Sequence, residues 1–163
     1  MHKLNVGAGD MRLEDFENID SQPYAGVDVV CRVPPLPYED GTAQEIYTGH
    51  FVEHLAPWDV QPFLDECRRV LIAGGTLTIV VPDADKARLM VESGVIGPEA
   101  YALMVGGATY DDMPHWCLWS PQRLALALER GGFVVNTAYD WRTDPRVYDR
   151  TAGWQCGAQG VRS

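Results

Sequence analysis

The chain has 163 residues, a formal net charge of −10 at pH 7 and a hydrophobic share of 46%. This length predicts a single domain, residues 1–163, that can close a core without disulfide or metal support. The acidic balance disfavours a nucleic-acid partner, because binding of a phosphate backbone needs a basic surface. Neither a signal peptide nor an apolar run of membrane-spanning length is present, and four cysteines occur without a Cys-x-x-Cys pair. We therefore expect a soluble cytoplasmic protein that does not bind membranes.

The first predicted elements surround a Gly-x-Gly turn. A short buried strand over residues 4–6 leads into Gly7 and Gly9, a helix of one or two turns is expected from about Asp10, and a second strand ends at Asp20. Glycines allow a tight turn and the close approach of a ligand, and a helix start would direct unpaired N–H groups toward an anionic group. Asp20 is placed to accept two hydrogen bonds from a ribose diol. Together these features predict that the bare backbone of the glycines and the Asp20 carboxylate hold an adenosyl group.

The spacing disfavours a dinucleotide. A dinucleotide fingerprint has three glycines and an acidic residue about 20 residues further along, but Arg12 stands at the third glycine position. Asp20 also follows after a crossover too short to hold much helix. A plain glycine turn beside a solvated aspartate, in an ordinary α/β protein, is the alternative interpretation.

Strands and helices alternate along the rest of the chain. The strands are expected at 27–31, 44–49, 76–81, 133–139 and 147–161, and the helices at 57–71, 83–94, 98–105 and 121–130. We expect glycine at 74–75 to end the first of these helices in a left-handed cap, and Asp83 to cap the start of the next. The alternation predicts a mainly parallel sheet with helices on both faces and ligands beyond the carboxyl ends of its strands.

Six segments in register carry a resemblance to a known family: LNVGAGD (4–10), NID (18–20), LPYEDG (36–41), HFVEHL (50–55), RRVLIAGGTL (68–77) and VPD (81–83). Over residues 4–135 the chain resembles the class I S-adenosylmethionine-dependent methyltransferases, in the small branch with a His-x-x-Glu-His segment after the fourth strand. The resemblance implies an α/β, Rossmann-like three-layer sandwich with about seven strands, the last antiparallel. It also implies methyl transfer from S-adenosylmethionine to an O or N atom of a small or medium-sized acceptor.

The resemblance assigns these positions to the cofactor site: Gly7, Ala8, Gly9, Asp20, Val33, Leu36, His50 and Phe51. The glycine turn would line the methionyl and ribose part, Asp20 would hold the ribose hydroxyls, residues 33 and 36 would contact the adenine, and residues 50 and 51 would lie beneath the sulfonium. Two features depart from the family: Arg32 stands where relatives place an acid for the adenine amino group, and no helical segment precedes the first strand. These departures leave three alternatives open: weak cofactor affinity, a site completed by a partner subunit or by a large substrate, and a catalytically silent cofactor-binding or assembly subunit. A homo-oligomer is also possible.

An acceptor hydroxyl or amine may need its proton removed, and histidine is the usual base. We expect His50 or His115 in this catalytic role, with a structural role as the alternative for each, and a structural role for His54. The aromatic residues of the second half would form either a wall for stacking a substrate or a cover for the open end of the sheet. They are Tyr110, Trp116, Trp119, Trp141 and Trp154.

The segment from His50 to His54 also matches the His-x-x-Glu-His pattern of inverted zinc peptidases. On a helix its two histidines would share a face and could bind zinc, with Glu53 as a base. The segment instead leaves a strand, is closed by a proline at position 57, and is accompanied by no third ligand that the sequence marks. We therefore expect no metal site here.

Overall fold

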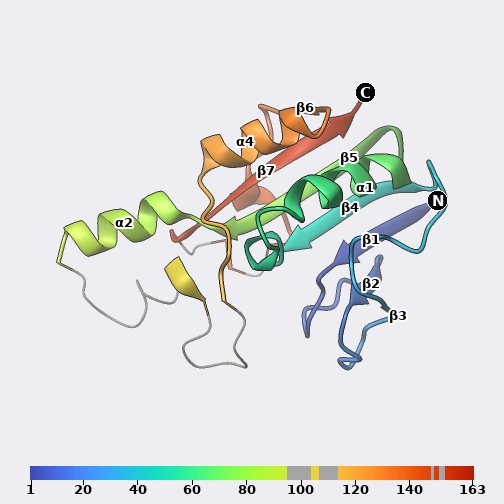
Figure 1. The fold of residues 1–163 in the computed structure, drawn as a ribbon, viewed down its shortest axis with the longest axis horizontal. Coiled ribbons are helices and arrows are strands. Elements are labelled where there is room, and N and C mark those ends of the chain that lie inside the picture. Colours follow the sequence, from blue (N-terminus) through green and yellow to red (C-terminus); the bar gives the residue numbers. More distant parts are fainter. Residues whose placement is uncertain (95–103, 107–113, 148, 151–152) are drawn as a thin grey trace.

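Seven strands form one sheet in this computed structural model, which describes residues 1–94, 104–106, 114–147, 149–150 and 153–163 (Figure 1). The strands are β1 (His2–Val6), β2 (Glu17–Asp20), β3 (Val29–Val30), β4 (Ala43–Gly49), β5 (Leu71–Pro82), β6 (Phe133–Val135) and β7 (Gln155–Arg162). Their order in the sheet is β3-β2-β1-β4-β5-β7-β6. The first five run parallel, and β7 is antiparallel to both of its neighbours. This confirms the predicted sheet and its antiparallel last strand.

The described α-helices are α1 (Val60–Val70), α2 (Ala84–Glu92) and α4 (Pro121–Arg130). Asp83 caps α2 as predicted, because its side chain accepts from the backbone N–H groups of Asp85 and Lys86. The helix predicted over 98–105 falls almost wholly outside the described residues. No helix in the described part of the chain is long and apolar enough to cross a membrane.

One face of the sheet carries the larger apolar core. α1 and α4 lie side by side across this face (Figure 1). Phe63 and Leu64 of α1, with Leu124 and Leu128 of α4, are at most 1% exposed and pack against alternate residues of the strands. Their three- and four-residue spacing places them on one side of each helix, which is why the sequence pattern located both helices.

Loops cover the opposite face, over the residues that the structure describes. Tyr47 and Val80 of the sheet form a smaller buried cluster with Trp141 and Val147, and Phe16 of the β1–β2 connection packs against it. The helices expected on this face are replaced here by the β1–β2 connection and by the chain between β6 and β7, which includes a short 3₁₀ helix, η2 (Trp141–Thr143).

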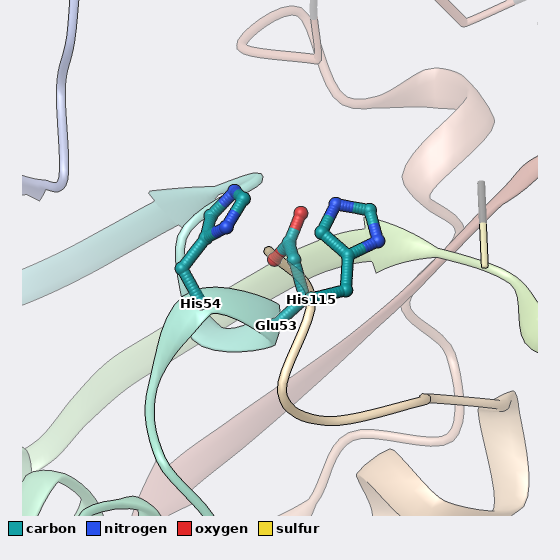
Figure 2. A group of neighbouring side chains, drawn as sticks. All are labelled: Glu53, His54 and His115. Atoms are coloured by element: carbon teal, nitrogen blue, oxygen red, sulfur yellow. The ribbon is translucent and has the colours of Figure 1, made fainter. Parts of the chain in front are cut away.

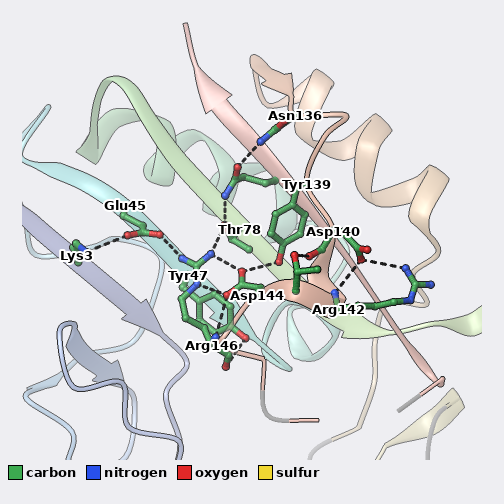
Figure 3. Close-up of polar contacts among 12 residues, drawn as sticks. Lys3, Glu45, Tyr47, Thr78, Asn136, Tyr139, Asp140, Arg142, Asp144 and Arg146 are labelled. Atoms are coloured by element: carbon green, nitrogen blue, oxygen red, sulfur yellow. Dashed lines mark hydrogen bonds and ion pairs between the residues drawn. The ribbon is translucent and has the colours of Figure 1, made fainter. Parts of the chain in front are cut away.

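A buried ion-pair network holds these loops to the sheet (Figure 3). The Arg146 guanidinium pairs with Asp144 at 2.6 Å and with Glu45, and it lies 4.9 Å from the centre of the Tyr47 ring. Burial disfavours the charged form of Asp144, but its hydrogen bonds to Arg146 outweigh burial and lower the pKa of that carboxyl. The buried Asp144 carboxylate is therefore paired with a partly buried cation.

The helix predicted from Asp10 is wrong: residues 7–16 form turns. The side chain of Asn18 holds this connection in place by hydrogen bonds. Its Oδ1 accepts from Leu13 N–H and from Asn5 Nδ2, both at 2.9 Å. Asn5 Nδ2 also donates to the carbonyl of Met11 at 2.9 Å. No helix N-terminus therefore faces the predicted site from this connection.

The glycine cap predicted for the helix before β5 is also wrong. α1 ends at Val70, and Leu71 is already extended, with φ −67° and ψ 145°. Gly74, with φ +78°, lies inside β5, where the register against β4 shifts between Ala43 and Glu45. Its left-handed conformation therefore belongs to this irregularity of the strand and not to the end of a helix.

Candidate functional site

The carboxyl ends of β1, β2 and β4 meet at one edge of the sheet, as the parallel topology requires. A cleft of about 760 Å³ opens there. Its wall combines residues that follow β1, β2, β3 and β4 with Trp116, from a segment much later in the chain. The location is the one in which open α/β sheets bind ligands.

The predicted cofactor residues divide between this cleft and its surroundings. Those that line the cleft are Gly7, Asp20, Val33 and Phe51. Ala8 and His50 line a neighbouring cavity of about 40 Å³ that Gly7 also borders. Leu36 is buried in the core at 2% exposure, where its N–H donates to Glu66.

The glycine turn is covered at Gly7 and open at Gly9. A Cβ atom at Gly7, whose φ is +71°, would lie 2.4 Å from the Phe51 ring. At Gly9, with φ +53°, a Cβ atom would meet nothing within 4 Å. Phe51 therefore occupies the space where a side chain at Gly7 would lie, and Gly7 itself still lines the cleft.

Asp20 is turned toward the glycine turn. Its Oδ2 accepts from the N–H of Gly9 and its Oδ1 from the N–H of Gln22, both at 2.9 Å. An ionised carboxylate has about four acceptor positions, so two remain for further donors. The side chain is thus fixed in direction and still able to accept from two hydroxyl groups.

His50, directly after β4, is the one non-glycine residue with positive φ (+56°) in the described part of the chain. Its Nδ1 lies 3.3 Å from Glu53 Oε1, and its Nε2 lies 3.0 Å from Oε1 of Gln155. Burial disfavours the charged ring, but the contacts to Glu53 and Gln155 outweigh burial and raise the pKa of His50. Both ring nitrogens face acceptors, so the ring is arranged as a double donor without a lone pair for a substrate proton.

A second group of titratable side chains includes His54, which lines the cleft (Figure 2). Glu53 and His54 belong to a short 3₁₀ helix, η1 (Val52–His54), so the segment does not form the α-helix of a zinc peptidase motif. His115 comes from a distant segment, and its ring lies 5.0 Å from the ring of His54. The buried Glu53 carboxylate lies between the two rings (Figure 2).

The ring of His54 has a defined tautomer. Its Nδ1 lies 3.2 Å from the carbonyl oxygen of Pro114. A carbonyl oxygen only accepts hydrogen bonds, so Nδ1 carries the proton and Nε2 keeps its lone pair in the neutral ring. His54, which was expected to be structural, is thus the histidine in the cleft wall that can bind a proton or a cation.

Comparison with known proteins supports the family. Residues 11–79 match the family model described as "Methyltransferase domain". An S-adenosylmethionine-dependent methyltransferase from Thermotoga maritima has the same fold, with a TM-score of 0.67 and 15% identity over 99% of this chain and 82% of that one. The six motifs, the domain match and the sheet order agree. In the matched segment and in its fold, the chain is similar to S-adenosylmethionine-dependent methyltransferases.

Other methyltransferases have the same fold at similarly low identity. A methyltransferase from Aquifex aeolicus has a TM-score of 0.60 and 17% identity, over 100% of this chain and 82% of that one. The 1,6-didemethyltoxoflavin-N1-methyltransferase of Burkholderia thailandensis, solved with S-adenosylhomocysteine, has a TM-score of 0.64 and 18% identity over 98% and 70%. No curated protein sequence matches the chain.

The aromatic residues of the second half of the chain have different surroundings. Trp116 is 61% exposed and lines the cleft, whereas Trp119 and Trp141 are at most 7% exposed. Trp154 packs on the ring of His50, and Tyr110 lies outside the described residues. Among the four of these aromatic residues that the structure describes, Trp116 is the one that lines the cleft, as expected of a substrate-stacking residue.

Several residues of the cleft had no signal in the sequence. Trp58, 75% exposed, lines the cleft beside Asp59, just before α1 begins. Ser21 and Gln22 line it after β2. Exposed residues in loops follow no periodicity, and the parallel topology alone could have indicated that residues following β2 and β4 lie here.

Proposed function

We propose that the chain binds S-adenosylmethionine in this cleft and transfers its methyl group to an O or N atom of a small or medium-sized acceptor. The observation that carries the proposal is the Asp20 carboxylate, which is fixed to the glycine turn and retains acceptor positions at the edge of the cleft. The cleft's volume of about 760 Å³ lies within the range of small-molecule sites, which is roughly 300–1,000 Å³.

The residues present suit an adenosyl group. Asp20 would accept from the ribose hydroxyls, and Val33 and Phe51 would provide apolar contact for the adenine. Arg32 also lines the cleft, but a guanidinium has no acceptor, so the adenine amino group would have to bond to a backbone carbonyl. When bound, S-adenosylmethionine supplies a methyl carbon that its sulfonium already activates, so the contribution of the protein is mainly alignment.

The acceptor is proposed to bind toward Trp58 and Trp116. Both indole rings are more than half exposed in the cleft wall, where they could stack on a planar or sugar-like group. His54 supplies a ring nitrogen at the same end, whereas His50 is arranged as a double donor. This assignment moves the role of proton acceptor from His50 to His54, the last residue of η1.

A second candidate function is that of a silent cofactor-binding or assembly subunit. The two exposed tryptophans, 75% and 61% accessible, are an apolar surface that a partner protein could cover. A methyltransferase in complex with the Trm112 methyltransferase activator of Haloferax volcanii has a similar fold, with a TM-score of 0.60 and 14% identity over 99% of this chain and 82% of that one. In this alternative the cleft binds cofactor but no acceptor.

Methyl transfer distinguishes the two candidates. The purified chain is incubated with S-adenosylmethionine carrying a labelled methyl group and with fractionated small-molecule extract. We expect label in a product fraction, loss of that label in Asp20→Ala, and retention in Asp15→Ala, an exposed carboxylate in the same connection. Cofactor binding without transfer in any fraction would favour the silent subunit.

A further inference from the structure

Glu53, His54 and His115 bring one carboxylate oxygen and two ring nitrogens within 4.8 Å of one another (Figure 2). We infer that these three residues, called the metal triad below, bind one divalent transition-metal ion of the zinc type. Two imidazoles and one carboxylate are the donor set of several catalytic zinc sites, which keep a fourth position open for water or substrate. The same donors also suit iron(II), so the proposal concerns this class of ion.

The state of the Glu53 side chain supports the inference. Glu53 is 1% exposed, and its Oε2 is fully buried without a hydrogen-bond partner in the described part of the chain. A buried carboxylate oxygen left in this state is costly, and native structures seldom keep one without an ion or a water. Its Oε1 lies 3.3 Å from His50, a contact of the kind that orients ligating carboxylates.

The ring of His54 makes the second hydrogen bond that is typical of a metal-binding histidine. Its Nδ1–H donates to the carbonyl of Pro114, 3.2 Å away, and its Nε2 is left with a lone pair. Metal-binding histidines usually donate their second ring N–H to a carbonyl or carboxylate, because that bond fixes the tautomer and the direction of the ring.

Backbone hydrogen bonds hold the two halves of the metal triad together before any ion binds. The carbonyl of Glu53 accepts from the N–H groups of Trp116 and Cys117, at 2.8 and 3.1 Å. His115, the residue before Trp116, is itself held through its N–H to the carbonyl of Val105 at 3.0 Å. The third ligand is therefore placed beside η1 by the fold and not by chance contact of two long side chains.

The spacing is slightly wider than a coordinated ion requires. Bonds of about 2.0–2.2 Å in tetrahedral geometry would place the ligand atoms roughly 3.4 Å apart, whereas the present atoms lie within 4.8 Å of one another. His54 and His115 are both partly exposed, so rotation of their rings can close this difference.

This site differs from the one that the His-x-x-Glu-His pattern suggests. That pattern would use His50 and His54 as ligands and Glu53 as a base, whereas here Glu53 is a ligand and His115 replaces His50. His54 belongs to both the metal triad and the cleft wall, so a bound ion lies next to the space proposed for the acceptor. With an ion bound, the lone pair of His54 coordinates the ion, so His54 can accept a proton only in the metal-free chain. This last consequence rests on the proposed function, but ion binding does not.

Calorimetric titration of the full chain with zinc chloride, after removal of metal with a chelator and without cofactor, tests the inference. We expect one ion per chain, and affinity losses of at least about tenfold in His54→Ala, His115→Ala and Glu53→Gln. His2→Ala, a histidine at the start of β1, serves as the control and should keep its affinity within about twofold. Zinc should also raise the melting temperature of the wild type and of His2→Ala, but not of the triad variants.

Three results would overturn the inference. These are the absence of stoichiometric binding, loss of binding in His2→Ala, and loss in His50→Ala with full retention in His115→Ala. Because Glu53 is buried, far-UV circular dichroism checks that Glu53→Gln folds; if it does not, the two partly exposed histidines decide the outcome. A chain that binds no zinc could still bind the cofactor, and a chain that transfers no methyl group could still bind zinc. The two experiments therefore test the two proposals separately.

Discussion

Two groups of residues in and around the cleft are built in different ways. The glycine end (Gly7, Gly9 and Asp20) lies within residues 7–20 and is held by hydrogen bonds between neighbouring strands and turns. The histidine end (Glu53, His54 and His115) joins segments about 60 residues apart through bonds that include His54 to Pro114. Residues that are close in sequence can bind the same ligand in many proteins of one fold. A site that is assembled from distant segments can differ from one such protein to the next. This difference suits a shared cofactor and a variable acceptor.

The largest effect is expected when the glycine end is filled. Gly7→Ala places a methyl group 2.4 Å from the Phe51 ring at a φ of +71°. Strain and overpacking together should lower the free energy of unfolding by about 4 kcal/mol. Gly9→Ala, with a similar φ of +53° and nothing within 4 Å, isolates the backbone strain and should lower it by about 1–2 kcal/mol. Equal losses in urea unfolding would show that Phe51 does not occupy the space beside Gly7.

The connection that contains the glycine turn also packs against the ion-pair network of Arg146. Phe16, in the same connection as the glycine turn, lies against Arg146, whose guanidinium is 6.0 Å from the ring centre. Arg146→Met leaves the buried Asp144 carboxylate without its partner and should lower the free energy of unfolding by about 3 kcal/mol. Arg142→Met, which removes the exposed pair with Asp140, is the matched control and should change it by less than about 0.5 kcal/mol. A similar change in both variants would contradict a buried network.

The same network predicts a smaller dependence on pH. The pKa of Asp144 is lowered from its ordinary value of 3.8 in the folded chain. Its contribution to stability is therefore present above 3.8 and is lost as the pH falls through the folded-state pKa. Asp144→Asn should lower stability at neutral pH, and its difference from the wild type should shrink on acidification. A difference that stays constant in urea unfolding across this range would refute the assignment.

The smallest effect on stability is expected at the histidine end. Trp116→Ala removes a side chain that is 61% exposed, so the free energy of unfolding should change by less than about 1 kcal/mol. Once an acceptor is identified, the same variant should raise the KM for it without changing the affinity for cofactor. Leu126→Ala, an exposed apolar residue on α4, is the control and should change neither property.

The sequence predicted what depends on local periodicity and missed what depends on distant contacts. The strand around Ile46 and the helix with Leu124 were located correctly, because their apolar residues follow the period of each element. The sequence predicts a helix after Gly9, because nothing in its composition reveals that Asn18 accepts a hydrogen bond from the backbone of this connection.

The same distinction applies to the candidate site: residues that follow adjacent strands were predictable, and residues placed by distant contacts were not. The pattern of Gly7 and Asp20 placed both residues at the cleft, since they directly follow adjacent parallel strands. His115 and Trp116 were noted for their chemistry alone, and Trp58 was not singled out. Their positions follow from packing of the 114–117 segment on η1, which no spacing in the sequence encodes.

Calorimetric titration with S-adenosylhomocysteine tests the central claim, that the glycine end holds the adenosyl group, most directly. We predict micromolar binding to the wild type, at least about tenfold weaker binding to Asp20→Ala because a charged acceptor is lost, and affinity within about twofold of the wild type for His54→Ala at the opposite end. No binding to the wild type at millimolar concentration, or unchanged binding in Asp20→Ala, would contradict the account.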